Sequence, residues 1–336
     1  MAIRFCALLT AALMLLGSGA SAQTPGVAVQ VSGGKPIPSV SQLQTILRPG
    51  GFVRDVLGWH KADPKCNLLR SPSTGITIPT SMDTLYRNVQ AAGGKNFVTL
   101  AFNNMKCGQP TLSGAVTFPD TPELRAEFAA YAAGVVRQVP ALGGISIWNE
   151  MNGTWSGGFH NRAAQLTAYC ALSNAVITEV RKVNADIPIA IGATVGWSID
   201  RWFNDMFDVY GCMGKGDATI WLDVHPFLRG RKIPGYRQTD WDGWNSSVGN
   251  LRAHGVSNPL FATEWGAKAG YRWSLAHPHG NYMSTFQARV LAQDPGWAGF
   301  LWFEMLYDKD IPHAGLFDAS GGLTPLGNQY VSEFIE

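Results

Sequence analysis

The sequence carries little charge, and no long apolar run follows its first 22 residues. Charged side chains make up 15% of the chain, and the formal net charge is +2, or about +1 without Arg4. A charge this close to zero gives no electrostatic reason to expect a nucleic-acid partner. No later stretch stays apolar over the roughly 20 residues that cross a bilayer. We therefore expect neither a nucleic-acid partner nor stable membrane insertion.

Short signatures of several other protein classes are also missing. Without a C-x-x-C pair a zinc site is not expected, and without a G-x-S-x-G elbow a serine hydrolase is not expected. No G-x-G-x-x-G follows the first predicted strand, which weakens the case for an open nucleotide-binding sheet. His277-Pro278-His279 has no carboxylate or third histidine at ligand spacing, so it predicts a solvated loop. We expect no metal and no cofactor.

The first 22 residues have the pattern of an export signal. Arg4 gives a positive start, Phe5–Leu16 is apolar but too short to span a bilayer, and Ala20-Ser21-Ala22 is a small-x-small cleavage site. We therefore predict a signal peptide at 1–22 and a secreted or periplasmic mature chain at 23–336. That chain, of about 314 residues, has the length of one catalytic α/β barrel domain.

Short apolar runs alternate with longer helical patterns along the mature chain. Eight such repeats predict right-handed βαβ units that close into a single (β/α)8 TIM barrel of the α/β class. An open doubly wound sheet is the alternative. The predicted strands are Val27–Val31, Gly51–Val56, Asn96–Phe102, Gly144–Trp148, Ile187–Ala193, Thr219–Val224, Leu260–Thr263 and Ala298–Phe303, and the predicted helices are Val40–Leu47, Met82–Ala92, Thr121–Gln138, Asn161–Val183, Asp200–Tyr210, Trp241–His254, Tyr282–Gln293 and Pro325–Ile335.

Four cysteines lie outside the signal: Cys66, Cys107, Cys170 and Cys212. An even number in an exported chain indicates two disulfides, for which three connectivities are possible. The strand map favours Cys66–Cys107 and Cys170–Cys212, because each of these pairs would lie on neighbouring βα units.

Two of the predicted strands end in a glutamate. An apolar run delivers Asn149 and Glu150 to the end of the fourth strand, and another delivers Glu264 to the end of the seventh. Active sites of such barrels lie at the carboxyl ends of the strands. A lone glutamate there is more often salt-bridged or solvated. A pair on facing strands, each beside a tryptophan, suits glycosidic bond hydrolysis, in which one carboxyl protonates the leaving oxygen and the other captures the sugar carbon.

The segment Trp148-Asn149-Glu150-Met151-Asn152 closely resembles the Trp-Asn-Glu-Pro-Asn acid/base signature of the clan A glycoside hydrolases. The nearest families in character are 39 and 5. The resemblance covers about residues 50–335, and its further landmarks follow in clan order. They are Phe52–Asp55 with Trp59, Asp223–Phe227, Glu264, Phe300–Glu304, and Gly315–Asp318 with Thr324-Pro325.

The resemblance implies a role for each matching residue. Glu150 would be the acid/base and Glu264 the nucleophile of a retaining hydrolase. Arg54 would keep Glu264 ionised, because a nearby cation lowers the pKa of a carboxylate. Asn149 would bind the sugar 2-hydroxyl, and Trp302 would form the floor of the sugar site.

Three further residues are candidates for substrate contacts because of their places at strand ends: Asn103, His225 and Trp265. A turn-forming role is equally open for Asn103, and a satisfied core histidine is the alternative for His225. The chain has 12 tryptophans, and we expect most of them to be core residues. Those in or near predicted βα loops, some of which we expect to form sugar platforms, are Trp155, Trp197, Trp241, Trp244 and Trp273.

The sequence departs from the clan pattern at two positions. Phe227 stands where the clan usually has a tyrosine that bonds the nucleophile, so Tyr236 or Tyr271 would have to supply that hydroxyl if the alignment holds. Met151 replaces the usual proline, which we consider neutral.

Together these features predict a monomeric, secreted retaining glycosidase with a carbohydrate substrate. The β-linked poly- or oligosaccharide would be cleaved internally, since loops of moderate length favour an open groove. A catalytically inactive carbohydrate-binding barrel is one alternative, and a metal-assisted or lyase barrel enzyme is another.

Overall fold

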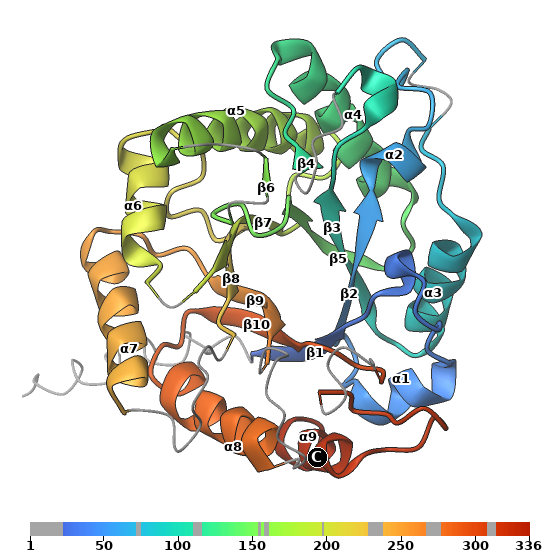
Figure 1. Ribbon diagram of the computed structural model, residues 1–336, viewed down its shortest axis with the longest axis vertical. Helices are drawn as coiled ribbons and strands as arrows, with labels where there is room; N and C mark the ends of the chain where they lie inside the picture. The colour runs from blue at the N-terminus through green and yellow to red at the C-terminus, as the bar shows by residue number, and fades with distance from the viewer. Residues whose placement is uncertain are drawn as a thin grey trace, which may run out of the picture.

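Eight parallel strands form a closed barrel surrounded by helices (Figure 1). The computed structural model describes residues 23–71, 75–109, 116–153, 156–157, 161–196, 198–227, 238–266, 277–307 and 314–336. The predicted signal peptide at 1–22 lies outside them. Around the barrel the strands follow the order β1-β10-β9-β8-β7-β5-β3-β2, so each neighbours the next barrel strand in the chain and the last pairs with the first. The prediction of a (β/α)8 barrel is confirmed, and the open sheet is excluded.

Helices follow the strands in regular alternation. The barrel strands are β1 (Thr24–Ala28), β2 (Phe52–Gly58), β3 (Lys95–Ala101), β5 (Leu142–Ile147), β7 (Ile189–Val195), β8 (Ile220–His225), β9 (Leu260–Trp265) and β10 (Trp297–Trp302). The main helices are α1 (Val40–Ile46), α3 (Thr80–Ala91), α4 (Pro122–Gln138), α5 (Arg162–Arg181), α6 (Asp200–Asp208), α7 (Gln238–Ala253), α8 (His277–Phe286) and α9 (Pro325–Phe334). Shorter elements are η1 (Val31–Gly33), α2 (Trp59–Ala62), η3 (Met105–Cys107), the π-helical turn η4 (Gln287–Leu291), and the paired strands β4 (Val116–Thr117) and β6 (Ser156–Gly157). None of the helices in the described ranges has both the length and the apolar character to cross a bilayer.

Most predicted boundaries differ from the structure by a few residues, and two of the differences change the local structure. The first strand ends at Ala28 rather than Val31, and the chain then turns into η1. It turns there because the amide and hydroxyl of Ser32 donate to the Asp55 carboxylate on β2, at 3.0 and 2.6 Å. The other difference concerns α8, whose first residue is His277, so the His-Pro-His segment begins a helix and does not lie in a loop.

The barrel interior has an apolar lower layer and a polar layer above it. The lower layer is a buried cluster of Phe52, Phe97, Ala190, Phe261 and Leu301. Side chains of a strand alternate, so the residue two positions further on faces the same side, one layer nearer the carboxyl ends. The residues of the upper layer are all at most 2% exposed, and they are Arg54, Thr99, Ser146, Asp223 and Thr263. This layer supports the mouth of the barrel from below.

Between barrel and helices lies a layer of large aromatic side chains. Trp265 stacks on Phe286 of α8, with ring centroids 4.4 Å apart, and Trp297 stacks on Trp244 of α7. Trp241 and Trp244 are 2% and 1% exposed, so they are core residues and not the loop platforms considered for them. Trp155, Trp197 and Trp273 lie outside the described residues. Burial of each such side chain stabilises the fold by a few kcal/mol.

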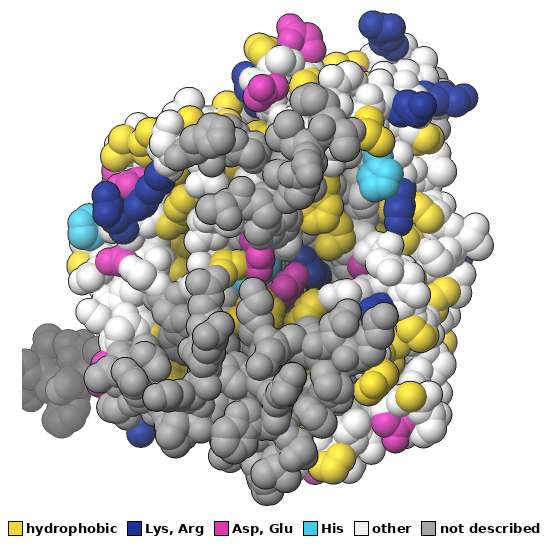
Figure 2. All heavy atoms as spheres, viewed as in Figure 1, with side chains coloured by type: hydrophobic (Ala, Val, Ile, Leu, Met, Phe, Trp, Pro, Cys, Tyr) yellow, Lys and Arg dark blue, Asp and Glu magenta, His cyan; other side chains and the backbone are white. Residues whose placement is uncertain are grey.

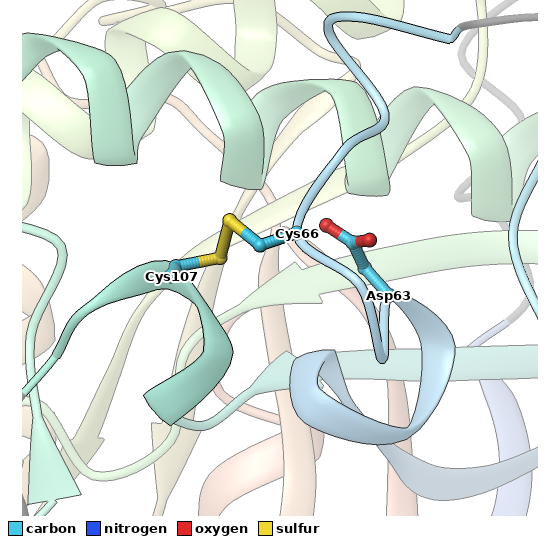
Figure 3. Close-up of side chains that lie close together, drawn as sticks. All are labelled: Asp63, Cys66 and Cys107. Atoms are coloured by element: carbon cyan, nitrogen blue, oxygen red, sulfur yellow. A yellow bond between two sulfur atoms is a disulfide. The ribbon is translucent and has the colours of Figure 1, made fainter.

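Both predicted disulfides are present. Cys66–Cys107 ties the segment after α2 to η3, and Cys170–Cys212 ties α5 to the segment after α6, with Cα atoms 5.2 and 4.6 Å apart. Figure 3 shows Asp63 beside the first bridge. The two sulfurs are bonded to each other, so they are not available as thiolate ligands. Asp63, Cys66 and Cys107 therefore do not form a metal site.

Replacing Cys170 and Cys212 together by alanine should lower the free energy of unfolding by about 2–4 kcal/mol. The bridge closes a segment of 42 residues, and opening it releases chain entropy to the unfolded state. Urea denaturation would measure the loss. The Cys66→Ala/Cys107→Ala protein is the matched variant, since its bridge spans 41 residues. Two variants as stable as the parent would contradict a structural role for these bridges.

Candidate active site

Arg54 lies in the polar layer below the barrel mouth and connects four strands. It projects from β2, is 2% exposed, and donates from three nitrogens. Nη1 bonds Glu264 Oε1 at 2.5 Å, Nη2 bonds Asn149 Oδ1 at 2.9 Å, and Nε bonds Thr99 Oγ1 at 2.8 Å. A guanidinium has its donors in a rigid fork, so these bonds fix the positions of their acceptors. The predicted contact between Arg54 and Glu264 is therefore present.

Glu264 reaches the interior through a local irregularity of β9. From the inward-facing Phe261, regular alternation would bring Thr263 inside and turn Glu264 outward. The register between β9 and β10 instead shifts by one residue, because Ala262 pairs with Phe300 and Trp265 pairs with Trp302. Such an extra residue redirects the side chains beside it. Thr263 and Glu264 thus both face the barrel interior, and Trp265 faces the helices.

Glu150 is directed by a tight turn at the end of β5. Trp148 and Glu150 both adopt left-handed backbone conformations, with φ of 68° and 46°. Such conformations cost non-glycine residues on the order of 1–3 kcal/mol each and persist where neighbouring groups hold them, often at active sites. Here the Trp148 amide donates to Leu100 on β3, at 2.9 Å, and the Met151 amide donates to Ala193 on β7, at 3.2 Å. The turn is therefore held by the strands on either side.

The two glutamates lie close together over the barrel mouth. One oxygen of each carboxylate and one ring nitrogen of His225 all lie within 4.8 Å of one another. Retaining glycosidases have carboxyl groups about 5–5.5 Å apart, whereas inverting enzymes leave room for a water at about 6.5–9.5 Å. Figure 2 shows acidic atoms beside basic ones in a hollow at the centre of this face. Oxygens within 4.8 Å of each other suit the retaining arrangement better than the inverting one.

His225 lies between the two carboxylates and is fully buried. Its Nδ1 is 3.4 Å from Glu150 Oε1 and 3.7 Å from Glu264 Oε2, while Nε2 is 2.8 Å from Thr263 Oγ1. Burial alone would lower the pKa of His225. Attraction by Glu264, Glu150 and Asp223 outweighs burial and raises the pKa above its usual value. His225 is therefore part of the site's polar network, not an isolated core histidine.

The other predicted contact residues divide into two groups. Asn149 and Asn103 are half-buried just after the ends of β5 and β3, and Asn149 bonds Arg54. Trp302 and Trp265 are wholly buried and pack against each other, with ring centroids 4.7 Å apart. This corrects the expectation that these two tryptophans contact the sugar, because both lie in the layer between barrel and helices.

Phe303 and Phe227 pack together with Ala28 in a small buried cluster. Their rings meet edge to face at 5.8 Å, and each residue is 8% exposed. Neither offers a hydroxyl to Glu264. Tyr236 and Tyr271, considered as substitutes for the clan tyrosine, lie outside the described residues. Within the described ranges, the cations or donors facing Glu264 are Arg54 and His225.

A divalent metal between Glu150, His225 and Glu264 is disfavoured by the local charge. These residues offer three ligand atoms at a suitable separation. However, the guanidinium of Arg54 already neutralises Glu264 at 2.5 Å, and a second cation would stand beside this fixed positive charge. The arrangement favours chemistry carried out by the carboxylates themselves.

Sequence reasoning gave no role to three residues behind His225. Thr263 donates to Asp223 Oδ1 at 2.6 Å, and the Ser146 hydroxyl donates to Asp223 Oδ2. All three residues are fully buried. A signal was available in the sequence, since each is a polar residue within an otherwise apolar strand that leads to the site.

Comparisons with known proteins identify the fold. The sequence matches no protein-family model and no curated protein. A solved family 39 glycoside hydrolase from the gut symbiont Bacteroides cellulosilyticus WH2 is similar, with a TM-score of 0.65 and 19% identity over 93% of this chain and 63% of its own. A glucosidase from Croceicoccus marinus has a TM-score of 0.65 at 13% identity, covering 92% and 65%. A monomeric β-xylosidase from Caulobacter crescentus CB15 has 0.61 at 16%, covering 92% and 67%.

These comparisons set the scope of the likeness. The chain spans about two thirds of the length of these three structures. At such low identity the likeness shows a shared fold. The resemblance to family 39 that the sequence indicated is confirmed at the level of the barrel.

Replacing Arg54 by methionine should lower the free energy of unfolding by about 3–5 kcal/mol, because it leaves the buried Glu264 carboxylate without its partner. The Arg54→Met/Glu264→Leu protein, which removes both charges, should regain much of that loss. Guanidinium denaturation of both variants and of Glu264→Leu alone completes the double-mutant cycle. Additive losses in the double variant would show that the two side chains are not coupled.

Proposed function

We propose that the protein is a retaining glycoside hydrolase. The observation that carries the proposal is the pair of carboxylates at the ends of β5 and β9. One oxygen of each lies within 4.8 Å of the other, and a buried arginine holds Glu264. The fold shared with glycoside hydrolases supports it. In this account Glu150 is the acid/base and Glu264 the nucleophile.

The first step breaks the glycosidic bond. The proton of Glu150 moves to the leaving oxygen, the bond from that oxygen to the anomeric carbon breaks, and a Glu264 oxygen bonds the same carbon. Arg54 Nη1 donates to Glu264 Oε1 at 2.5 Å, which holds the attacking carboxylate in position with a positive charge beside it.

The second step releases the sugar. A water gives its proton to Glu150, now a carboxylate, and its oxygen attacks the anomeric carbon, which leaves Glu264 as an anion again. Two inversions at that carbon give net retention. Arg54 Nη2 occupies the Asn149 carbonyl oxygen, which leaves the amide –NH2 end of Asn149 to donate to a sugar hydroxyl. That bond would strengthen as charge develops on the sugar.

We propose a β-linked glycan as the substrate of this site and export as the fate of the chain. Solved structures of the same fold include a β-xylosidase and an exo-β-1,4-mannosidase from Opitutaceae bacterium strain TAV5. Two disulfides fit an oxidising compartment outside the cytoplasm. The proposed mode is internal cleavage by a monomer. Release of mixed oligosaccharides would support internal cleavage, and release of single sugars would support end-wise action like that named for the mannosidase.

One observation favours a second candidate, a carbohydrate-binding barrel without catalysis. Phe227 provides no hydroxyl for Glu264, and the phenyl ring packs on His225 and Phe303 instead. Against this candidate, both glutamates and the arginine are in place. The two candidates differ in whether Glu264 forms a covalent bond to a sugar.

An activated 2-deoxy-2-fluoro β-glycoside should label Glu264. The fluorine slows both steps and the activated leaving group speeds only the first, so the glycosyl-enzyme accumulates. Its mass is measured in the intact protein and in the peptide containing residue 264. Glu264→Gln is the control and should remain unlabelled. A panel of β-gluco, β-xylo and β-manno probes that never labels the parent protein would favour the binding barrel.

Leaving-group dependence should separate the roles of the two glutamates. Glu150→Ala should lower kcat for poor leaving groups by about 10²–10⁴-fold and affect activated aryl glycosides much less, because these need little protonation. Added azide should restore part of the turnover on activated substrates. Glu264→Ala should be inactive on both types. Equal losses in the two variants, or activity that survives in Glu150→Gln and Glu264→Gln, would contradict this assignment and favour metal-assisted or lyase chemistry.

A further inference from the structure

A chain of buried hydrogen bonds runs behind His225, on the side away from the glutamates. His225 Nε2 is 2.8 Å from Thr263 Oγ1, and Thr263 Oγ1 is 2.6 Å from Asp223 Oδ1. The Ser146 hydroxyl bonds the other Asp223 oxygen. The four residues come from β5, β8 and β9, and all are 0% exposed. A buried polar group costs free energy unless it is paired, so a buried network of four residues is expected to have a function.

When Asp223 is ionised, counting hydrogens fixes the direction of these bonds. Both oxygens of Asp223 face hydroxyl donors, and the Thr263 amide lies 3.4 Å from Oδ1 as a further donor. A threonine hydroxyl has one hydrogen. If Thr263 gives this hydrogen to Asp223, its oxygen can only accept from His225, which must then carry a proton on Nε2.

The opposite face of the ring then has a defined chemistry. With Nε2 protonated, Nδ1 of a neutral His225 is a lone pair directed at Glu150 Oε1, 3.4 Å away. It can accept the proton of Glu150, so Glu150 and His225 share one proton. When two groups are coupled in this way, the apparent pKa belongs to the pair.

We propose that Asp223 and Thr263 form a relay that fixes the His225 proton on Nε2, so that Nδ1 and Glu150 together retain the proton that Glu150 delivers to the leaving oxygen. The inference rests on the proposed function and assigns positioning roles to Thr263 and Asp223. Phe227 supports the inference, because a phenylalanine at position 227 offers no phenolic hydroxyl to Glu264. His225 is then the second group, after Arg54, that faces Glu264.

The charges around the ring agree with this arrangement. Glu150 faces it from the end of β5, Asp223 from β8, Glu264 from β9, and Arg54 lies beyond Glu264 on β2. The pKa of Asp223 is raised by burial, and His225, the two hydroxyl donors and Arg54 offset part of that rise. A protonated Asp223 would reverse the relay, since Thr263 would then donate to Nε2 and the ring would carry its proton on Nδ1. The two directions place the ring proton on different nitrogens and can therefore be distinguished.

The first test reads the tautomer of His225 by ¹⁵N–¹H correlation of ¹⁵N-histidine-labelled protein, at a pH above the titration of the ring. The chain has 7 histidines, and the His225→Gln spectrum identifies the signal of His225. We expect Nε2–H in the parent protein and in Thr263→Ser, which keeps the hydroxyl. Thr263→Val removes the acceptor and should move the proton to Nδ1. In Asp223→Asn the –NH2 group would donate to Thr263, so this variant should also move the ring proton to Nδ1. It replaces Thr263→Val as the test if Thr263→Val does not fold.

The second test is the pH profile of kcat/KM on an aryl glycoside with a poor leaving group. In Thr263→Val an Nδ1–H would donate to Glu150 and favour its ionised form. The alkaline limb, which reports loss of the Glu150 proton, should therefore move to lower pH by about one unit, the effect of one buried hydrogen bond. Thr263→Ser should keep the parent profile.

The outcomes separate the relay from the activity. Nδ1–H in the parent protein contradicts the relay, whether or not the protein turns over substrate. A Thr263→Val profile that matches the parent contradicts the role in retaining the proton. If the parent protein shows Nε2–H but turns over no glycoside substrate, the proposed function is contradicted, and the inferred tautomer of His225 still holds.

Discussion

The ion pair between Arg54 and Glu264 is the contact on which the site depends. A guanidinium at 2% exposure is stable only if its donors are satisfied, because an unpaired buried charge costs several kcal/mol. Its three acceptors come from β3, the end of β5, and β9. Folding the barrel around Arg54 therefore brings Asn149 and Glu264 to fixed positions before any ligand arrives. Such preorganisation is how a rigid scaffold lowers the barrier of a charge-separating reaction.

The polar layer limits how much of the barrel interior can be filled by apolar side chains. Barrel interiors are usually filled by branched apolar side chains. Here the upper layer gives up apolar packing to hold Arg54, Asp223 and their hydroxyl partners, which tolerate burial only because they bond one another. Stability comes instead from the aromatic layer outside the strands and from the phenylalanine cluster below.

Much of this architecture could be predicted from the sequence. Strand and helix periodicity is local, so it indicated the barrel, and the order of strands then indicated both disulfides. Position at strand ends, with the motif around Glu150, indicated the two glutamates, and the resemblance to clan A indicated Arg54. The direction of Trp265 could not be predicted, because it depends on a one-residue register shift against β10 that pairing alone reveals. Thr263 and Asp223 were missed for a related reason, since single polar residues in apolar strands gain meaning only when neighbouring strands align them.

From the close approach of the two carboxylates we expect the released sugar to keep the anomeric configuration of the substrate. Proton NMR of a hydrolysis reaction, followed from its first minutes, shows the anomeric configuration of the newly released sugar before it mutarotates. A β-linked substrate should yield the β-anomer first, because two displacements at one carbon restore its configuration. Initial release of the α-anomer would mean a single displacement by water, and would contradict a nucleophilic role for the arginine-bound carboxylate.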